Sequence, residues 1–182
     1  MKQILSELMR DHRHISAVLT ILKNKLAMLE DRGRPDFNLM SEVIDYLEDY
    51  ADGYHHVRED LIFGYMRDHY QQCESLVDQA AKEHQQLAQL TQTLRESVDQ
   101  VLIDAPFLME DFTALLHRFI DKQAQHLAFE ENKLFPLIAK QMTEQDWQQF
   151  SRVAPVRQDP LASSQRDERY RQLYNALIDD LR

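Results

Sequence analysis

Two stretches of the sequence carry the same pair of chemically active side chains, a histidine followed four residues later by a glutamate. HHVREDLIF contains His55 and Glu59, and HLAFEENKLF contains His126 and Glu130. On an α-helix the fourth residue along lies about 40° round and about 6 Å further on, and so shares the face. An imidazole and a carboxylate on one face can hold a metal ion, although surface helices use the same spacing for charge pairing.

An internal repeat adds two more histidines to this set. RDHRHISAVLTIL aligns with KEHQQLAQLTQTL, and each begins with an acid beside a histidine, His12 in the first and His84 in the second. His12 precedes His55 by 43 residues, and His84 precedes His126 by 42. The chain therefore resembles two copies of one helical hairpin. The distances from the histidines to the two turns predict that all four lie in one layer.

Four inward imidazoles and two inward carboxylates define the chemistry that we expect. The helical wheel turns His14 and His117 toward solvent and places His56 at a boundary. Buried carboxylates need partners, and a pair of divalent metal ions supplies these more completely than protonated histidines do. Mixed imidazole and carboxylate donors suit iron, so we expect two oxo- or hydroxo-bridged iron ions, with manganese or zinc as alternatives. The expected ligands are His12, His55, Glu59, His84, His126 and Glu130.

Long helices must position these ligands, because apolar residues recur at helical spacing through most of the chain. Helices are predicted over about residues 2–29, 37–67, 71–102 and 105–140. Short turns join them, with Asp36 and Asp104 expected as N-caps. The pattern predicts an all-α, up-down-up-down four-helix bundle over residues 1–142.

A C-terminal helical extension is predicted over residues 143–182. TEQD at its start resembles a capping box, and an amphipathic helix is expected over about 165–181. This extension could pack on the bundle or join two subunits as a homodimer.

Composition excludes several classes of function. The net charge is −10 without a basic block, which argues against binding nucleic acid or an anionic membrane surface. No apolar run approaches the ~20 residues that a membrane span needs. Only 3 glycines and 5 prolines occur in 182 residues, which favours a few long helices over many strands. The N-terminus shows no apolar signal core, and the single Cys73 fits a reducing compartment, so a cytoplasmic location is expected.

The quoted motifs resemble the hemerythrin-like, HHE cation-binding domains over about residues 5–140. The resemblance rests on DH at 11–12, HHVREDLIF, EH at 83–84 and HLAFEENKLFP. It implies a four-helix bundle with a non-haem di-iron centre. By resemblance, ligand positions fall on His12, His55, Glu59, His84 and His126.

Two positions separate this sequence from the oxygen-carrying hemerythrins that it resembles. Those proteins have a fifth histidine at the position of Ala80, and they take their last carboxylate at the position of Glu131. Relatives that repair damaged iron centres use the position of Glu130 instead. A regular helix turns Glu131 about 140° away from His126, so the spacing favours Glu130.

Three functions are compatible with these features. The first is a di-iron protein that binds or senses O₂ or NO, or that handles iron. The second is a di-iron redox enzyme or an iron-centre repair protein. The third is a helical interaction module whose polar layer is only structural.

Overall fold

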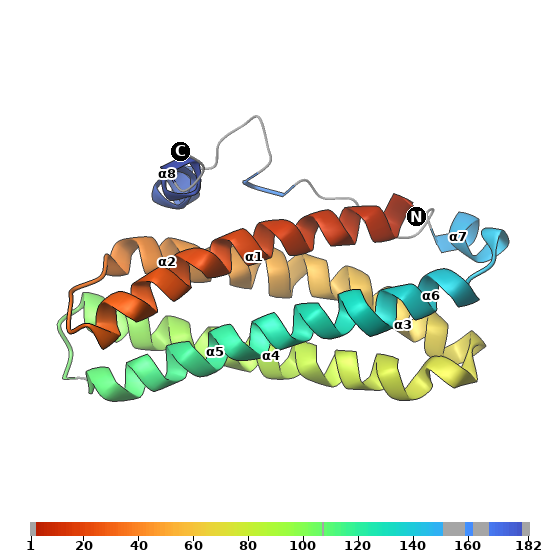
Figure 1. Ribbon diagram of the computed structural model, residues 1–182, viewed down its shortest axis with the longest axis horizontal. Helices are drawn as coiled ribbons and strands as arrows, with labels where there is room; N and C mark the ends of the chain where they lie inside the picture. The colour runs from red at the N-terminus through yellow and green to blue at the C-terminus, as the bar shows by residue number, and fades with distance from the viewer. Residues whose placement is uncertain (1–2, 107, 151–158, 162–167, 180–182) are drawn as a thin grey trace.

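The computed structural model describes residues 3–106, 108–150, 159–161 and 168–179. Within them, four antiparallel helical segments lie lengthwise beside one another (Figure 1). Their elements are α1 (Gln3–Glu30), then α2 (Phe37–Tyr46) with η1 (Leu47–His55) and α3 (His56–His69), then η2 (Gln71–Cys73) with α4 (Glu74–Leu102), and finally α5 (Met109–Phe129) with η3 (Glu130–Leu134) and α6 (Phe135–Gln141). The predicted up-down-up-down bundle is thereby confirmed.

The buried core consists of two apolar clusters, one on each side of a polar layer. The first cluster includes Leu22, Val43 and Phe112, toward the α1–α2 turn. The second includes Leu8, Met66 and Ile138, toward the opposite end. His12 lies between Leu8 and Ile15 along α1, so the predicted histidine layer separates the clusters. Apolar packing above and below this layer fixes the height at which each helix presents its polar side chains.

Short turns end the helices, and one of them differs from the prediction. Asp36 caps α2 as expected, since its carboxylate accepts hydrogen bonds from the amides of Asn38 and Leu39. Asp104 is not the N-cap of the fourth helix. It follows the end of α4 with a φ of 53°, in the left-handed region that ends many helices, and α5 begins only at Met109. An aspartate at this place in the sequence indicates a turn. It does not indicate whether the residue follows the preceding helix or caps the next one.

Two wide-turned segments interrupt the second and fourth helical segments. η1 and η3 are π-helices, in which the backbone hydrogen bonds span five residues instead of four. η1 ends at His55 and η3 begins at Glu130, so both adjoin the polar layer. Such segments occur frequently at functional sites.

The C-terminal segment contacts the bundle through its described parts. In α7 (Glu144–Phe150), Thr143 and Asp146 form the predicted capping box, with the Thr143 amide donating to Asp146 at 2.7 Å. After η4 (Glu168–Tyr170), α8 (Arg171–Asp179) packs on α1 and α2 and is seen nearly end-on in Figure 1. The connection over residues 151–158 and most of the predicted start of the last helix lie outside the described residues. The domain division at residue 142 and the homodimer stay predictions.

Within the described chain, every helix is too short or too polar to span a lipid bilayer.

Candidate metal centre

The six predicted ligands meet in the polar layer of the bundle. We call them the inner cluster. Four segments supply them: α1, the η1–α3 segment, α4 and the α5–η3 segment. None is more than 4% exposed to solvent, and both glutamates are fully buried. The inner cluster comprises His12, His55, Glu59, His84, His126 and Glu130.

The two glutamates connect the four histidines in pairs. Glu59 lies 3.2 Å from His55 Nε2 through Oε1, and the same oxygen lies 3.3 Å from His12 Nε2. Its other oxygen lies 3.4 Å from His84 Nε2. Glu130 also contacts three histidines, with Oε2 3.4 Å from His126 and 3.3 Å from His12, and Oε1 3.4 Å from His84. Each carboxylate therefore spans two sides of the layer, as a bridging ligand must.

The inner atoms have the character of metal donors. All four Nε2 atoms and all four glutamate oxygens are buried and lack a hydrogen-bond partner among the described residues. Their contacts of 3.2–3.4 Å are ion pairs only while the histidines are protonated. Neutral histidines would leave these buried atoms without a bond in place of the water that they lose, which would be costly. Two donors bound to one metal at about 2.1 Å lie about 3.0–3.4 Å apart, which matches the distances found here. The donor set thus fits divalent metal ions.

A second ring of carboxylates contacts the outward nitrogens of the same histidines. We call Asp11, Asp60, Glu83 and Glu131 the outer carboxylates. His12 Nδ1 lies 3.1 Å from Glu131, and His84 Nδ1 lies 2.8 Å from Asp60. His126 Nδ1 lies 3.0 Å from Glu83, and His55 Nδ1 lies 3.4 Å from Asp11. A carboxylate at Nδ1 favours the tautomer whose Nε2 lone pair points inward toward a metal.

The outer carboxylates follow the internal repeat. Asp11 and Glu83 each precede an inner histidine and contact the histidine of the next helical segment. Asp60 and Glu131 each follow an inner glutamate and contact the histidine on the first helix of a hairpin. Both rings therefore have the same approximate two-fold symmetry.

Glu83→Gln is expected to weaken metal binding about 10- to 100-fold, because changes to such outer partners have effects of this size. The substitution removes the charge that orients His126 while keeping the side-chain shape. Competition with a chelator of known affinity measures the change. Asp121→Asn is the matched control, since this exposed acid pairs with His117 on the surface of α5. Equal affinities for Glu83→Gln and the wild type would contradict an orienting role for Glu83.

Opposing effects set the protonation of the metal-free cluster. Burial disfavours the charged form of His12, but the contacts with Glu130 and Glu59 outweigh it and raise the pKa of His12 to about 10. Burial also opposes charge on His84, whose contacts with Asp60, Glu130 and Glu59 raise its pKa to about 12. Burial and Glu59 favour the neutral form of Glu130, yet the histidines around it lower its pKa to about 2. Without metal, the glutamates are therefore paired with protonated histidines.

Two phenylalanines at the ends of the repeated stretches cover the cluster. Phe63 packs on His84 with ring centroids 5.7 Å apart, and Phe135 packs on His12 at 5.2 Å. The second stretch has one more residue than the first between its histidine and its phenylalanine. The π-helix η3 lies within this interval and takes up the extra residue, because its turns hold more residues than α-turns. Both rings belong to the same apolar cluster, so they cover the polar layer on the side away from the α1–α2 turn.

The adjacent acids of the second stretch occupy different positions. Glu130 is fully buried and faces the inner nitrogens. The side chain of Glu131 is 34% exposed and contacts the outward Nδ1 of His12. This arrangement supports Glu130 as the ligand and gives Glu131 an orienting position.

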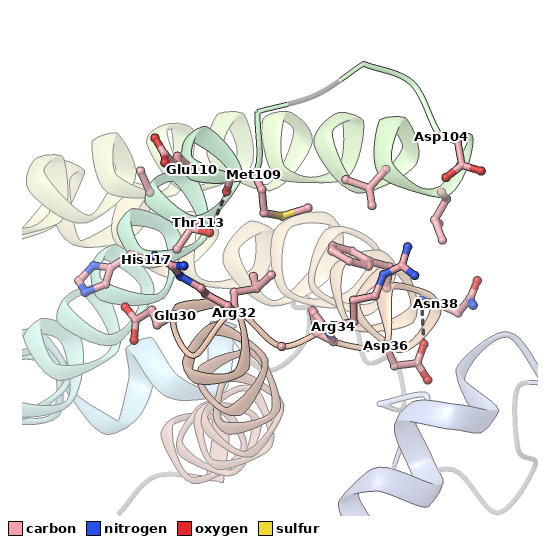
Figure 2. A pocket seen from close by; sticks show the side chains of 17 residues that line it. Glu30, Arg32, Arg34, Asp36, Asn38, Asp104, Met109, Glu110, Thr113 and His117 are labelled. Atoms are coloured by element: carbon pink, nitrogen blue, oxygen red, sulfur yellow. Dashed lines mark hydrogen bonds between the residues drawn. The ribbon is translucent and has the colours of Figure 1, made fainter.

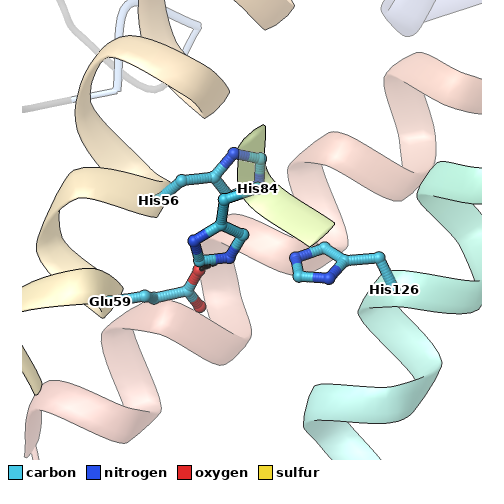
Figure 3. Close-up of side chains that lie close together, drawn as sticks. All are labelled: His56, Glu59, His84 and His126. Atoms are coloured by element: carbon cyan, nitrogen blue, oxygen red, sulfur yellow. Dashed lines mark ion pairs between the residues drawn. The ribbon is translucent and has the colours of Figure 1, made fainter. Parts of the chain in front are cut away.

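The predicted solvent exposure of the other histidines agrees with the structure for some of them and not for others. The side chain of His117 is 57% exposed, as predicted, whereas that of His14 is 35% exposed and bonds to Asp159 at 2.6 Å. His56 is not at the rim but 3% exposed, because α4 covers that side of α3. Figure 3 shows His56 together with Glu59, His84 and His126. Sequence reasoning also missed the outer carboxylates, although the acids before His12 and His84 and after Glu59 and Glu130 were a signal for them.

A surface hollow lies at the turn end of the bundle, away from the inner cluster. Its lining includes Arg32, Asp36, Asp104 and His117 (Figure 2). It shares no residue with the inner cluster or the outer carboxylates, and it brings no comparable set of metal donors together.

A four-helix bundle around a buried layer of histidines and glutamates defines a class of metal-binding helical proteins. The family model of the hemerythrin HHE cation binding domain matches residues 3–138, and the chain belongs to this family. It is therefore a cation-binding domain, and its histidine–glutamate cluster fits a metal site. Comparisons with curated proteins and with solved structures gave no match.

Proposed function

We propose that this chain is a non-haem di-iron protein that binds or senses O₂ or NO, or that handles iron. The observation that carries the proposal is the set of eight buried donor atoms without hydrogen-bond partners. In this proposal Glu59 and Glu130 would contribute to holding both ions, His12 and His55 would hold one ion, and His84 and His126 would hold the other. Such ions, when bound, supply redox chemistry and coordination positions for a small ligand.

The protein residues prepare the site in three ways. The outer carboxylates hold the imidazoles with Nε2 inward, so that little reorganisation is needed on binding. Phe63 and Phe135 restrict water next to His84 and His12. Burial of both glutamates keeps the layer at low dielectric, which strengthens their attraction for cations.

Manganese and zinc suit the same donor types, so the identity of the metal is part of the proposal. Iron is favoured because two histidines for each ion and two shared glutamates would leave positions open for an exchangeable ligand. Zinc would be satisfied by four donors in tetrahedral geometry.

Mixing anaerobic Fe(II)-loaded protein with O₂, and separately with NO, tests the functional part of the proposal. A binding protein should give an optical band that stays constant while the gas is present. The band should disappear when the gas is removed. Rapid irreversible oxidation with continued consumption of O₂ or NO would support the alternative, a redox enzyme. An iron-loaded protein whose spectrum responds to neither gas would contradict the binding function.

A further inference from the structure

The turn between α4 and α5 carries large apolar side chains that belong neither to the core nor to a helix cap. Ile103 follows the end of α4 and is 75% exposed, and Leu108 precedes α5 and is 70% exposed. Leu108 occupies the N-cap position of α5, where its side chain accepts no hydrogen bond from the helix amides. Serine, threonine, aspartate or asparagine would accept one. Exposed apolar side chains without a role in the fold are typical of an interaction surface.

Most of the exposed large apolar residues of the described chain lie at this end of the bundle. Five of the seven surround the two turns, and they are Met28, Leu102, Ile103, Leu108 and Met109. We call the last four the apolar turn. Two of its members, Leu102 and Met109, also line the surface hollow, which has a volume of about 1030 Å³. An apolar projection therefore lies beside a recess.

The two sides of the hollow carry opposite charges. Arg32 and Arg34 come from the α1–α2 connection, whereas Asp104 and Glu110 come from the α4–α5 side (Figure 2). No ion pair or side-chain hydrogen bond joins any of these four side chains to another described residue. Asp36, on the basic side, already accepts two amide hydrogen bonds as the cap of α2. The hollow thus separates charges that could be paired by a partner.

A second copy of the chain matches both the shape and the charge of this surface. In a two-fold arrangement each contact occurs twice, with the roles of the copies exchanged. The apolar turn of each copy then enters the hollow of the other, and the acidic side of each hollow meets the basic side of its mate. Glu30, the other acid of the basic side, lies toward His117 (Figure 2). A partner of uniform charge would be repelled by one side of the hollow.

We propose that the turn end of the bundle is a dimer interface and that its partner is a second copy of this chain. The interface consists of the apolar turn, the hollow and the two charged sides. It shares no residue with the inner cluster or with α8. Dimerisation at this surface therefore needs neither a bound metal nor exchange of the C-terminal helix.

Sedimentation equilibrium of the full chain tests the apolar part of the interface in the wild type, Leu108→Ser and Leu61→Ser. Leu108→Ser removes an exposed leucine and places a favoured residue at the N-cap of α5, so the fold should be no less stable. Leu61→Ser makes the same exchange on α3, where Leu61 is 45% exposed. Wild type and Leu61→Ser should dimerise with the same Kd, and Leu108→Ser should raise the Kd at least about tenfold.

Charge reversal tests whether the partner is a second copy in the two-fold arrangement. One variant, Arg32→Asn with Arg34→Glu, makes both sides of the hollow acidic, and another, Asp104→Asn with Glu110→Lys, makes both sides basic. Asparagine is used at positions 32 and 104 because both have a positive φ, of 59° and 53°, which asparagine tolerates. Each variant alone should dimerise at least about tenfold more weakly than the wild type, since like charges then face each other. An equal mixture should form a heterodimer, because every pair of facing sides again carries opposite charges.

Three results would overturn the proposal. The first is a wild-type chain that sediments as a monomer at every concentration measured. The second is a wild-type Kd in folded Leu108→Ser, and the third is a mixture of the two folded charge variants that contains no heterodimer. Circular dichroism establishes that each variant is folded, and the leucine and charge variants test the interface independently of one another.

Discussion

Replacing Glu130 with alanine is expected to lower the metal content of saturated protein from two ions per chain to fewer than two. The Glu130 carboxylate lies within 3.3–3.4 Å of the inner nitrogens of three histidines, so its loss removes a bridge between the two halves of the centre. Glu59→Ala should have the same effect, because Glu59 also contacts three histidines. Elemental analysis of folded protein after metal loading measures the ratio.

The neighbouring residue provides a matched control for this experiment. Glu131→Ala removes the same kind of side chain one position later, where it contacts the outward nitrogen of His12. This variant should bind more weakly but should still reach two ions at saturating metal, and His117→Ala should behave as the wild type. If Glu131→Ala lost an ion while Glu130→Ala kept two, the ligand would be Glu131, as in the oxygen carriers that the sequence resembles.

Removing the metal is expected to lower the melting temperature by about 10–20 °C at pH 7. A ligand present at 100 times its Kd stabilises the folded state by about 2.7 kcal/mol per site, or about 5 kcal/mol for two sites. In a chain of this size each kcal/mol shifts the melting temperature by about 2–4 °C. Melting curves before and after verified chelation measure this difference. Identical curves would show that the folded state gains no stability from the metal.

The difference in melting temperature between metal-loaded and metal-free protein should widen as the pH rises from 7 to 9.5. The pKa of His12 is about 10 and that of His84 about 12 in the folded metal-free protein, both above the ordinary value of about 6.5. The stability that these charged histidines contribute is therefore fully present below pH 6.5. It is lost progressively as the pH rises toward the folded values. Metal-bound imidazoles carry no such proton, so the loaded protein escapes this loss. A difference in melting temperature that narrows with rising pH would contradict the raised pKa values of His12 and His84.

The sequence was informative about the inner cluster because helices of a bundle repeat their inward positions regularly. His12, His55, His84 and His126 share faces with buried apolar residues, and all four lie in the predicted layer. The helical segments agree with the expected spans to within a few residues. The spacing of four residues also predicted that Glu130 faces inward, and Glu130 is buried against the inner nitrogens whereas Glu131 contacts the outward nitrogen of His12.

Features that depend on neighbouring helices were not predictable in this way. A wheel treats each helix alone, so it placed His56 at a boundary that α4 in fact covers. The contacts of Asp60 with His84 and of Glu131 with His12 join different helices, and a single-helix pattern cannot show them. The wide turns of η1 and η3 also change the angle between successive residues, which a wheel of 100° per residue ignores.

The iron content of the wild-type protein tests the central claim most directly. Metal-free protein would be loaded anaerobically with Fe(II), freed of unbound metal and analysed for iron against the quantity of folded chain. We expect two irons per chain in the wild type, bound together in the buried layer, and fewer than two in Glu59→Ala. Protein that retains no iron, or no more than one ion per chain, would contradict a dinuclear centre formed by the inner cluster.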